Sequence, residues 1–245
     1  MAEIGYGYGS ECHLLRWMGR HQEQLNKAVL QALGTHKRLS WLDFKFDESK
    51  AWPDGELKGI DFLPKEPDSD GVRDAWGRYW PSSGNPPNWD AVGKLSSDAG
   101  ADEWLLVEAK AYVAEFTQSR ECGAGDASRT RIADALRKTI EAVGARPANG
   151  PDTWMETGHY QLANRLAFLH FMNRIPKTPK PARLLMVYFL KDEHRGWQCP
   201  STAAEWRGVI SKTYAEMGIP AEHGYKDRVR YLFLDVASAH FEIGL

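Results

Sequence analysis

Three residues in the middle of the chain, Asp90, Glu108 and Lys110, have the chemical types and the spacing of a hydrolytic site. Glu108 and Lys110 end an apolar run that begins at Glu103, and because they are two residues apart they leave the same face of a β-strand. Seventeen residues separate Asp90 from Glu108, enough for a hairpin with its loop at residues 96–101. Such a hairpin would bring two carboxylates and a lysine together.

Two adjacent carboxylates repel each other unless a cation lies between them, and hard oxygen ligands of this kind suit Mg²⁺ or Mn²⁺. A lysine beside the ion can hold or deprotonate a water, or stabilise charge on a phosphorane. Asp90, Glu108 and Lys110 are therefore candidate catalytic residues for hydrolysis of a phosphodiester, with the two carboxylates as metal ligands. The alternative is that Glu108 and Lys110 are solvated strand neighbours, a pairing worth about 0.2 to 1 kcal/mol.

Asp90, followed by Glu108-Ala109-Lys110 at the end of an apolar strand, resembles the signature of the PD-(D/E)xK, or restriction-endonuclease-like, nuclease superfamily. The resemblance implies that Asp90 and Glu108 bind one or two Mg²⁺ ions and that Lys110 assists the attacking water. The chain departs from the family pattern at the proline–aspartate dipeptide, which is Trp89-Asp90 here, with prolines at positions 86 and 87.

Glu11 is a further candidate ligand for the metal. A helix is expected over residues 10–33, and Glu11 lies three residues before Leu14 on its apolar stripe. In several branches of the superfamily the helix ahead of the sheet supplies one more carboxylate, which implies this role for Glu11 or, more weakly, for Glu23. The alternative is that Glu11 only complements the helix dipole.

A later helix, expected over residues 158–175, carries a polar face. Gln161, Asn164 and Arg165 are three and four residues apart, so they share one side of it. Recombination-type exonucleases of the superfamily carry a Gln and a Tyr on the helix after the catalytic strand, and Tyr160-Gln161 is similar, although adjacent here. The resemblance implies that Tyr160, Gln161 and Arg165 bind the substrate, with Arg165 as a bidentate donor to a phosphate. The alternative is that they cap and solvate the helix.

The hydrophobic pattern as a whole predicts an α/β fold. Besides the helix at 10–33, closed by Gly34, the expected elements are strands at 41–46, 103–112, 183–190 and, last, 228–236, and helices at 128–143 (closed by Gly144), 158–175 and 202–217. Strands separated by helices imply crossover connections and some parallel pairing. This order resembles the αβββαβ core of the nuclease superfamily with one extra strand. It implies a central mixed sheet of four to five strands flanked by helices, in a single domain spanning residues 1–245.

Between the first strands the chain carries a long stretch, about residues 47–88, that is rich in proline and tryptophan. It is too long for a plain loop and too aromatic for a linker, which predicts an ordered insertion. Its aromatic residues, Trp52, Trp76, Tyr79 and Trp80, are expected to cover the core. The alternative is that they stack on unpaired bases.

Composition fits one soluble, enzyme-sized domain. The chain has 245 residues, of which 42% are apolar and 26% are charged. No apolar run approaches the ~18 to 20 residues of a membrane span, and the N-terminus lacks the pattern of a signal peptide, so we expect a cytoplasmic protein without a membrane partner. The three cysteines are far apart and odd in number, which predicts reduced thiols.

The charge balance bears on the partner. A formal net charge of −2 gives no global attraction to nucleic acid, although basic residues can gather on one face. Candidates for such a face, or else solvated charges, are Arg129, Arg131, Arg137, Lys138, Lys177, Lys180 and Arg183. The resemblance implies nucleic acid as the partner, with DNA expected rather than RNA. A non-catalytic module of the same fold that binds protein or nucleic acid is the alternative; a small-molecule hydrolase ranks last, and assembly into a homo-oligomer stays open.

Overall fold

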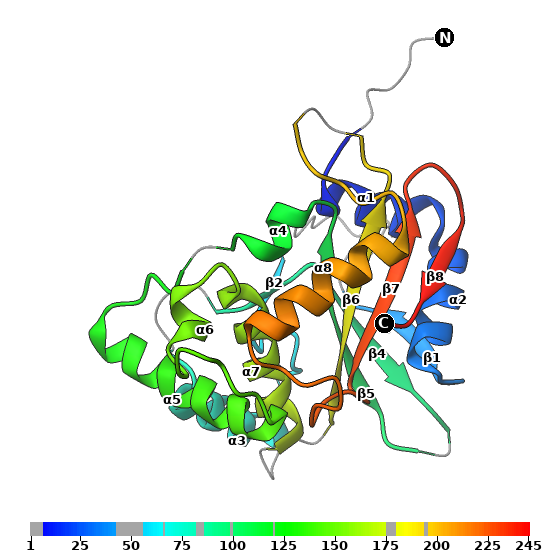
Figure 1. Ribbon diagram of the computed structural model, residues 1–245. Coiled ribbons are helices and arrows are strands. Elements are labelled where there is room, and N and C mark those ends of the chain that lie inside the picture. The colour runs from blue at the N-terminus through cyan, green and yellow to red at the C-terminus, as the bar shows by residue number, and fades with distance from the viewer. Residues whose placement is uncertain are drawn as a thin grey trace.

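The computed structural model describes residues 7–42, 56–65, 67–81, 86–98, 100–119, 121–174, 180–193 and 196–245, with residues 67–70 described for the backbone only. These residues form an α/β structure in which a mixed sheet is covered by helices on both faces (Figure 1). The sheet has six strands in the order β1-β4-β5-β6-β7-β8. Their bounds are β1 Arg38–Trp41, β4 Ala91–Ser96, β5 Glu103–Lys110, β6 Ala182–Leu190, β7 Val229–Asp235 and β8 Phe241–Ile243.

Parallel pairing lies in the middle of this sheet. β6 runs parallel to both β5 and β7, whereas β1 and β4, β4 and β5, and β7 and β8 pair antiparallel. Helices connect β5 to β6 and β6 to β7, as parallel neighbours require. The predicted mixed sheet flanked by helices is therefore present, but with six strands instead of four or five. The strand that the sequence did not predict is β8, an edge strand that follows the predicted last strand, β7.

Two helices, α1 (Ser10–Arg20) and α2 (Gln22–Leu33), cover one face of the sheet. The prediction of one continuous helix over residues 10–33 is wrong. The helix is interrupted at His21, whose φ of −129° and ψ of 32° are not helical. Gly34 ends α2 with a left-handed φ of 60°, as its position predicted.

The other face carries the remaining long helices. In Figure 1, α3, α5 and α7 lie together on the left, α8 crosses in front of the sheet, and α1 and α2 lie on the right. The helices predicted at 128–143, 158–175 and 202–217 are confirmed as α5, α7 and α8. The bounds are α3 Pro67–Tyr79, α4 Val113–Thr117, α5 Asp126–Val143, α6 Thr153–Glu156, α7 Tyr160–Arg174 and α8 Ala203–Glu216.

The central strand β5 is buried along its whole length, as its apolar run predicted. Leu105 belongs to the hydrophobic cluster beneath α1 and α2, and Leu106 belongs to the cluster beneath the helices of the other face. Because side chains alternate along a strand, Glu108 and Lys110 face the same side as Leu106. The fold therefore directs these two charges towards α5 and α7.

Only part of the predicted insertion at 47–88 falls within the described residues. That part contains α3 and a two-stranded ribbon made of β2 (Leu57–Lys58) and β3 (Asn88–Trp89). The strand predicted at 41–46 begins earlier than expected: β1 spans Arg38–Trp41, and residues 43–46 lie outside the described part of the chain.

The described aromatic residues of the insertion pack inside the protein. Trp76, Tyr79 and Trp80 are each at most 8% exposed. The hydroxyl of Tyr79 lies 3.2 Å from carbonyl oxygens of both α5 and α7, so α3 is tied to these helices. These side chains therefore cover the core and are not displayed for base stacking; Trp52 lies outside the described residues.

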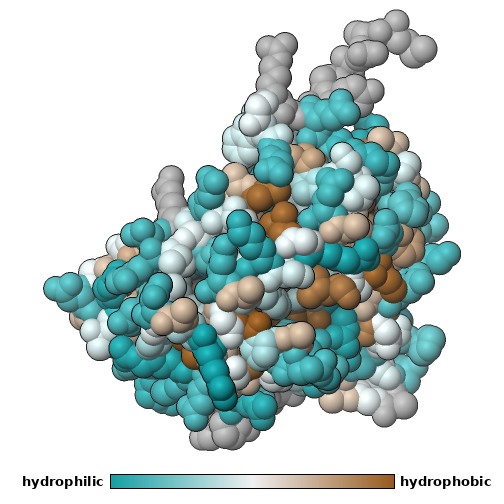
Figure 2. Space-filling view, in the orientation of Figure 1, coloured by the Kyte–Doolittle hydropathy of each residue, from teal (hydrophilic) through white to brown (hydrophobic). Residues whose placement is uncertain are grey.

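The face seen in Figure 2 is largely hydrophilic, with hydrophobic residues in small separate patches. None of the helices in the described segments is long and apolar enough to cross a membrane. Cys12, Cys122 and Cys199 are free thiols, as predicted.

Candidate active site

A hairpin brings Asp90 beside Glu108, where β4 begins and β5 ends. β4 pairs antiparallel with β5, with Ala91 opposite Val107. One residue earlier, the Asp90 N–H donates to the Val107 carbonyl at 3.1 Å, and the Asp90 carboxylate accepts the Ala109 N–H at 2.6 Å. The strand pairing thus fixes Asp90 next to the stretch of β5 that carries Glu108, as the spacing predicted.

Glu108 is held between two cations. Its Oε1 accepts from Lys110 Nζ at 2.5 Å and its Oε2 accepts from Arg165 Nε at 2.6 Å. All three side chains are almost completely buried, with exposed fractions of 1% for Glu108, 5% for Arg165 and 6% for Lys110. The three residues form a buried ion network, and the alternative of solvated strand neighbours does not hold.

Arg165 is oriented by contacts with α7 and with β3. Its guanidinium lies 5.0 Å from the centre of the Trp89 ring, and its Nη1 donates to Asn164 Oδ1 at 2.7 Å. Trp89 is itself fully buried, and its indole N–H donates to the Gly59 carbonyl at 3.1 Å. A rigid aromatic surface therefore supports the cation that faces Glu108.

The two carboxyl groups have opposite pKa shifts. Burial by itself would raise the pKa of Glu108, but the charges and hydrogen bonds of Arg165 and Lys110 outweigh it and hold the pKa below its ordinary value. Burial raises the pKa of Asp90 to about 7, and the negative charge of Glu108 adds to the rise. The Lys110 charge and the Ala109 N–H oppose this only in part. Near neutral pH, Glu108 is therefore ionised, whereas Asp90 is partly protonated.

A cleft of about 1010 Å³ adjoins these groups, although Glu108 itself does not line it. Asp90, Lys110 and Arg165 line its buried end, and Tyr160 and Gln161, at the start of α7, line it as well. α4 and the chain that follows it form another wall. One cleft therefore unites two of the proposed catalytic residues with all three residues that the sequence suggested for substrate binding.

Glu11 does not belong to this group. It is exposed in the first turn of α1, and it is not among the described residues that line the cleft. α1 packs on the face of the sheet opposite to Glu108 and Lys110. The prediction that Glu11 lies on the buried stripe is wrong: the buried residues of α1 are His13, Leu14, Trp17 and Met18. The weaker candidate, Glu23, is exposed too.

The donor set suits a hard divalent cation, but it is small. Asp90 and Glu108 offer oxygens from neighbouring positions, and a cation would relieve the repulsion that helps to raise the Asp90 pKa. Within the described parts of the chain, no three His, Cys, Asp or Glu side chains are grouped as a metal site. An ion here would rely on two carboxylates plus water or substrate oxygens, a mode that Mg²⁺ commonly uses.

Sequence reasoning named Arg165 but missed its partner. Arg165 lies between Leu162 and Leu166 on α7, and both leucines are buried. Helical periodicity could therefore have indicated a buried arginine, which requires a carboxylate. The spacing does not indicate that this carboxylate is Glu108, 57 residues away.

Comparison of the chain with protein-family models, with curated proteins and with solved structures yields no match. The chemistry of the site is therefore derived from its own residues and from the motif that they form.

Proposed function

We propose that the chain is a Mg²⁺-dependent nuclease of the PD-(D/E)xK class, which hydrolyses phosphodiester bonds of nucleic acid, DNA rather than RNA, with Mn²⁺ as an alternative ion. The observation that carries this proposal is that Asp90 and Lys110 line a 1010 Å³ cleft, while Glu108 is bonded to Lys110 directly beside that lining. Structural carboxylate–lysine pairs do not require such a cleft, whereas a hydrolytic site does. A cytoplasmic location is part of the proposal on grounds of sequence alone.

In this proposal each side chain has a distinct task. Asp90 and Glu108 hold the cation, which when bound supplies charge stabilisation for the phosphate oxygens and for the attacking water. Lys110, two residues from Glu108 on the same face of β5, positions that water. Arg165 and Gln161 donate to a phosphate oxygen, because both line the cleft from the start of α7.

The first experiment titrates Mg²⁺ and Mn²⁺ calorimetrically into the wild type and into an Asp90→Ala, Glu108→Ala double variant, with and without nucleic acid. We expect binding to the wild type and none to the variant. Cleavage of labelled DNA and RNA then follows for Asp90→Asn and Lys110→Ala, and each should reduce the metal-dependent rate by about 10²- to 10³-fold. Wild-type rates in both single variants would refute the assignment.

A matched control distinguishes a specific effect on cleavage at the site from a general effect of replacing an aspartate. Asp102 is an aspartate outside the cleft that pairs with Lys94 at 3.0 Å. Asp102→Asn makes the same change of side chain as Asp90→Asn but outside the cleft, and it should cleave as the wild type does. Circular dichroism of all variants checks that the fold is retained.

One observation favours a second candidate, a non-catalytic binding module with the same fold. Both oxygens of Glu108 already have cationic partners, so the network is electrostatically satisfied without an ion. A stable complex with intact nucleic acid or with a protein, together with no Mg²⁺ binding under any condition, would select this candidate over the nuclease.

A further inference from the structure

A carboxylate at the start of β5 has three cationic partners. Glu103, the first residue of this strand, is 5% exposed. Its carboxylate accepts from Lys37 Nζ at 3.0 Å, from Arg183 Nε at 3.0 Å and from Arg228 Nη1 at 2.5 Å. Burial by itself would raise the pKa of Glu103, but the three cations outweigh it and hold the pKa below its ordinary value. Glu103 is therefore ionised at neutral pH, and it can neutralise only one of its three partners.

The preceding carboxylate is shared as well. Asp102 lies 3.0 Å from Lys94 Nζ and 3.5 Å from Lys180 Nζ. Among the described residues, five cations thus surround two carboxylates, so that three positive charges are in surplus in a chain of formal net charge −2. The neighbouring described ion pairs are one-to-one and add no net charge: Arg38–Asp98, Lys226–Glu222 and Arg230–Asp227.

The five cations form a row across one end of the sheet. Lys37 precedes β1, Lys94 lies on β4, Lys180 and Arg183 lie at the start of β6, and Arg228 precedes β7. Because neighbouring strands are about 4.8 Å apart, the row extends for about 19 Å from β1 to β7. The side chains are between 19% and 35% exposed, so solvent reaches each of them. We call this set the basic row: Lys37, Lys94, Lys180, Arg183 and Arg228.

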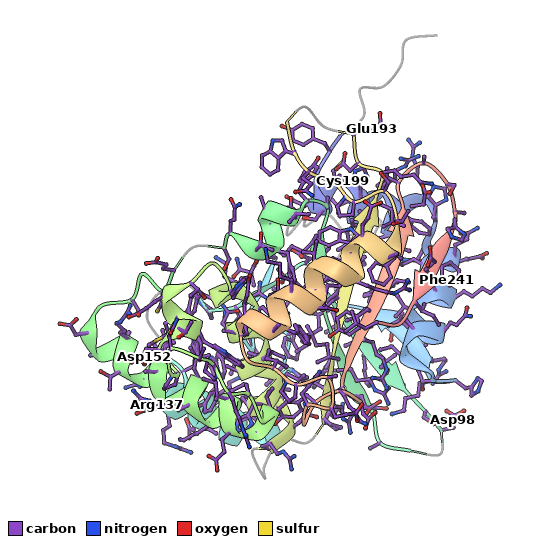
Figure 3. All side chains as sticks on the ribbon, in the orientation of Figure 1. Asp98, Arg137, Asp152, Glu193, Cys199 and Phe241 are labelled. Carbon is purple, nitrogen blue, oxygen red and sulfur yellow. The ribbon has the colours of Figure 1, made fainter. Side chains whose placement is uncertain are left out.

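The basic row lies at the end of the sheet away from the catalytic residues. In Figure 3, Asp98, in the connection from β4 to β5, lies at the lower end of the molecule, whereas Glu193 and Cys199, which follow β6, lie at the upper end. Sequence analysis proposed Lys180 and Arg183 for a basic face, and the structure brings them together here; Lys177, proposed with them, lies outside the described residues.

The cleft itself does not attract a polyanion. Of its described lining residues, the cations are Lys110 and Arg165, and both already bind Glu108. The remaining charged residues of the described lining are carboxylic acids: Glu56, Asp90, Glu115 and Glu121. Affinity for duplex DNA comes mainly from Lys and Arg that neutralise phosphates. A nuclease with this cleft must therefore obtain its affinity for DNA from cations elsewhere on its surface.

We propose, on the basis of the nuclease function above, that the basic row docks the phosphate backbone of duplex DNA. A row of about 19 Å suits a linear polyanion, because duplex DNA carries one negative charge per ~1.7 Å of its axis. Glu103 and Glu108 are five residues apart on β5, so the row and the catalytic residues are separated by about 17 Å along the strand. This length corresponds to about five base pairs, so one segment of DNA is long enough to contact both.

The test measures binding of a fluorescently labelled duplex of about 20 base pairs by fluorescence anisotropy, with EDTA so that the DNA stays intact, from about 50 to about 200 mM salt. Lys180→Gln leaves Lys94 beside Asp102, and Arg228→Gln leaves two cations beside Glu103, so both variants should fold. Each should raise Kd by roughly 3- to 10-fold near 0.1 M salt and reduce the salt dependence of log Kd by about one phosphate contact.

A matched pair of variants separates charge from structure. Asp102→Asn breaks the same ion pair as Lys180→Gln but removes a negative charge, so it should lower Kd where Lys180→Gln raises it. Loss of a merely structural ion pair would change Kd in the same direction in both variants. Because the cleft is unchanged, Asp102→Asn should still cleave at the wild-type rate when DNA is saturating.

A second control lies outside the basic row. Arg137, on α5, is an exposed cation that pairs with Asp134 at 2.9 Å. Arg137→Gln removes one positive charge, as Arg228→Gln does, and should bind DNA as the wild type does.

Three results would overturn the inference. They are an unchanged Kd in both Lys180→Gln and Arg228→Gln, weaker binding by Asp102→Asn, and no binding of DNA at the lowest salt. Vesicles with anionic lipids are tested alongside; if they bind through the same cations and DNA does not, the row is a lipid-binding surface and the inference is wrong.

The outcomes for the inference and for the nuclease function are separable. DNA binding that depends on the basic row, without cleavage in Mg²⁺, would sustain the row and refute the nuclease. Metal-dependent cleavage that is lost in Asp90→Asn, with a KM for DNA that Lys180→Gln and Arg228→Gln leave unchanged, would sustain the nuclease and refute the row.

Discussion

Replacing Arg165 by alanine tests the buried ion network directly. The substitution removes the cation that lies 2.6 Å from Glu108 and leaves Lys110 as the remaining partner of a carboxylate that is 1% exposed. Breaking a buried pair by removing one partner typically costs 3 to 5 kcal/mol, and the second cation places Arg165→Ala towards the lower end. Loss of the guanidinium over Trp89 adds about 0.5 to 2 kcal/mol. We therefore expect the free energy of unfolding at pH 7 to fall by about 3.5 to 5 kcal/mol.

The pH dependence of this loss has a defined sign. In the wild type the pKa of Glu108 lies below its ordinary value of 4.5, so its stabilising contribution is complete above that pH and disappears only as the pH falls through the lowered value. In Arg165→Ala, burial raises the pKa with Lys110 alone to oppose it. The folded variant then takes up a proton earlier, and the difference in stability between wild type and variant should narrow as the pH falls from 7 towards 4.5.

Urea unfolding followed by circular dichroism, with EDTA present, measures both effects. The double variant Arg165→Ala, Glu108→Gln removes the unpaired charge and leaves Lys110 beside Asp90. It should lose less stability than the sum of the two single variants, with a coupling of about 1 to 3 kcal/mol. A loss below about 1 kcal/mol for Arg165→Ala that is constant with pH would refute the buried network.

Three further predictions concern Asp90, just before β4, and the wall of the cleft. The pKa of Asp90 is about 7, above its ordinary value of 3.8, so ionisation of Asp90 destabilises the fold as the pH rises between these values. The urea concentration at the midpoint of unfolding should therefore be higher for Asp90→Asn than for the wild type at pH 8, and the two midpoints should be equal at pH 4. Mg²⁺ requires the ionised carboxylate, so calorimetric affinity for wild type should rise by up to about tenfold per pH unit below 7 and level off above it, and a pH-independent affinity would exclude Asp90 as a ligand. Gly158→Ala would place a Cβ 2.3 Å from the Thr117 carbonyl oxygen and should cost about 1 to 3 kcal/mol in thermal unfolding. Gly123→Ala, where a Cβ meets nothing within 4 Å, is its control and should change stability by less than about 0.5 kcal/mol.

Local patterns predicted the centre of the fold well. The apolar run of β5, the spacing of the β4–β5 hairpin and the glycine after α2 each depend on neighbouring residues, and all three are present in the structure. The break at His21 has only a weak signal, because the nearby Gly19 is tolerated inside a helix and the bend separates two helices that both pack on the sheet. β8 has three residues, none of them buried, so it shows too little alternation to be recognised.

Only the residues of the site that belong to one hairpin could be predicted to lie together. Asp90, Glu108 and Lys110 share that hairpin, so strand geometry relates them. Arg165 lies on α7, in the crossover that connects the parallel strands β5 and β6. Sequence periodicity predicts which face of such a helix is buried, but not which strand that face contacts. The error at Glu11 has the same origin: its spacing from Leu14 did not reveal that the first turn of α1 is exposed there.

The charges of the site indicate how an ion and a strand would have to enter. Above pH 7 the two carboxylates, Asp90 and Glu108, balance the two cations, Lys110 and Arg165, so the buried group is neutral. A divalent cation alone would leave two positive charges in a poorly solvated place, which is unfavourable. A phosphodiester brings a negative charge and a second partner for Arg165, so an ion and a phosphate stabilise each other there. Metal binding should therefore be stronger with nucleic acid present than with the protein alone.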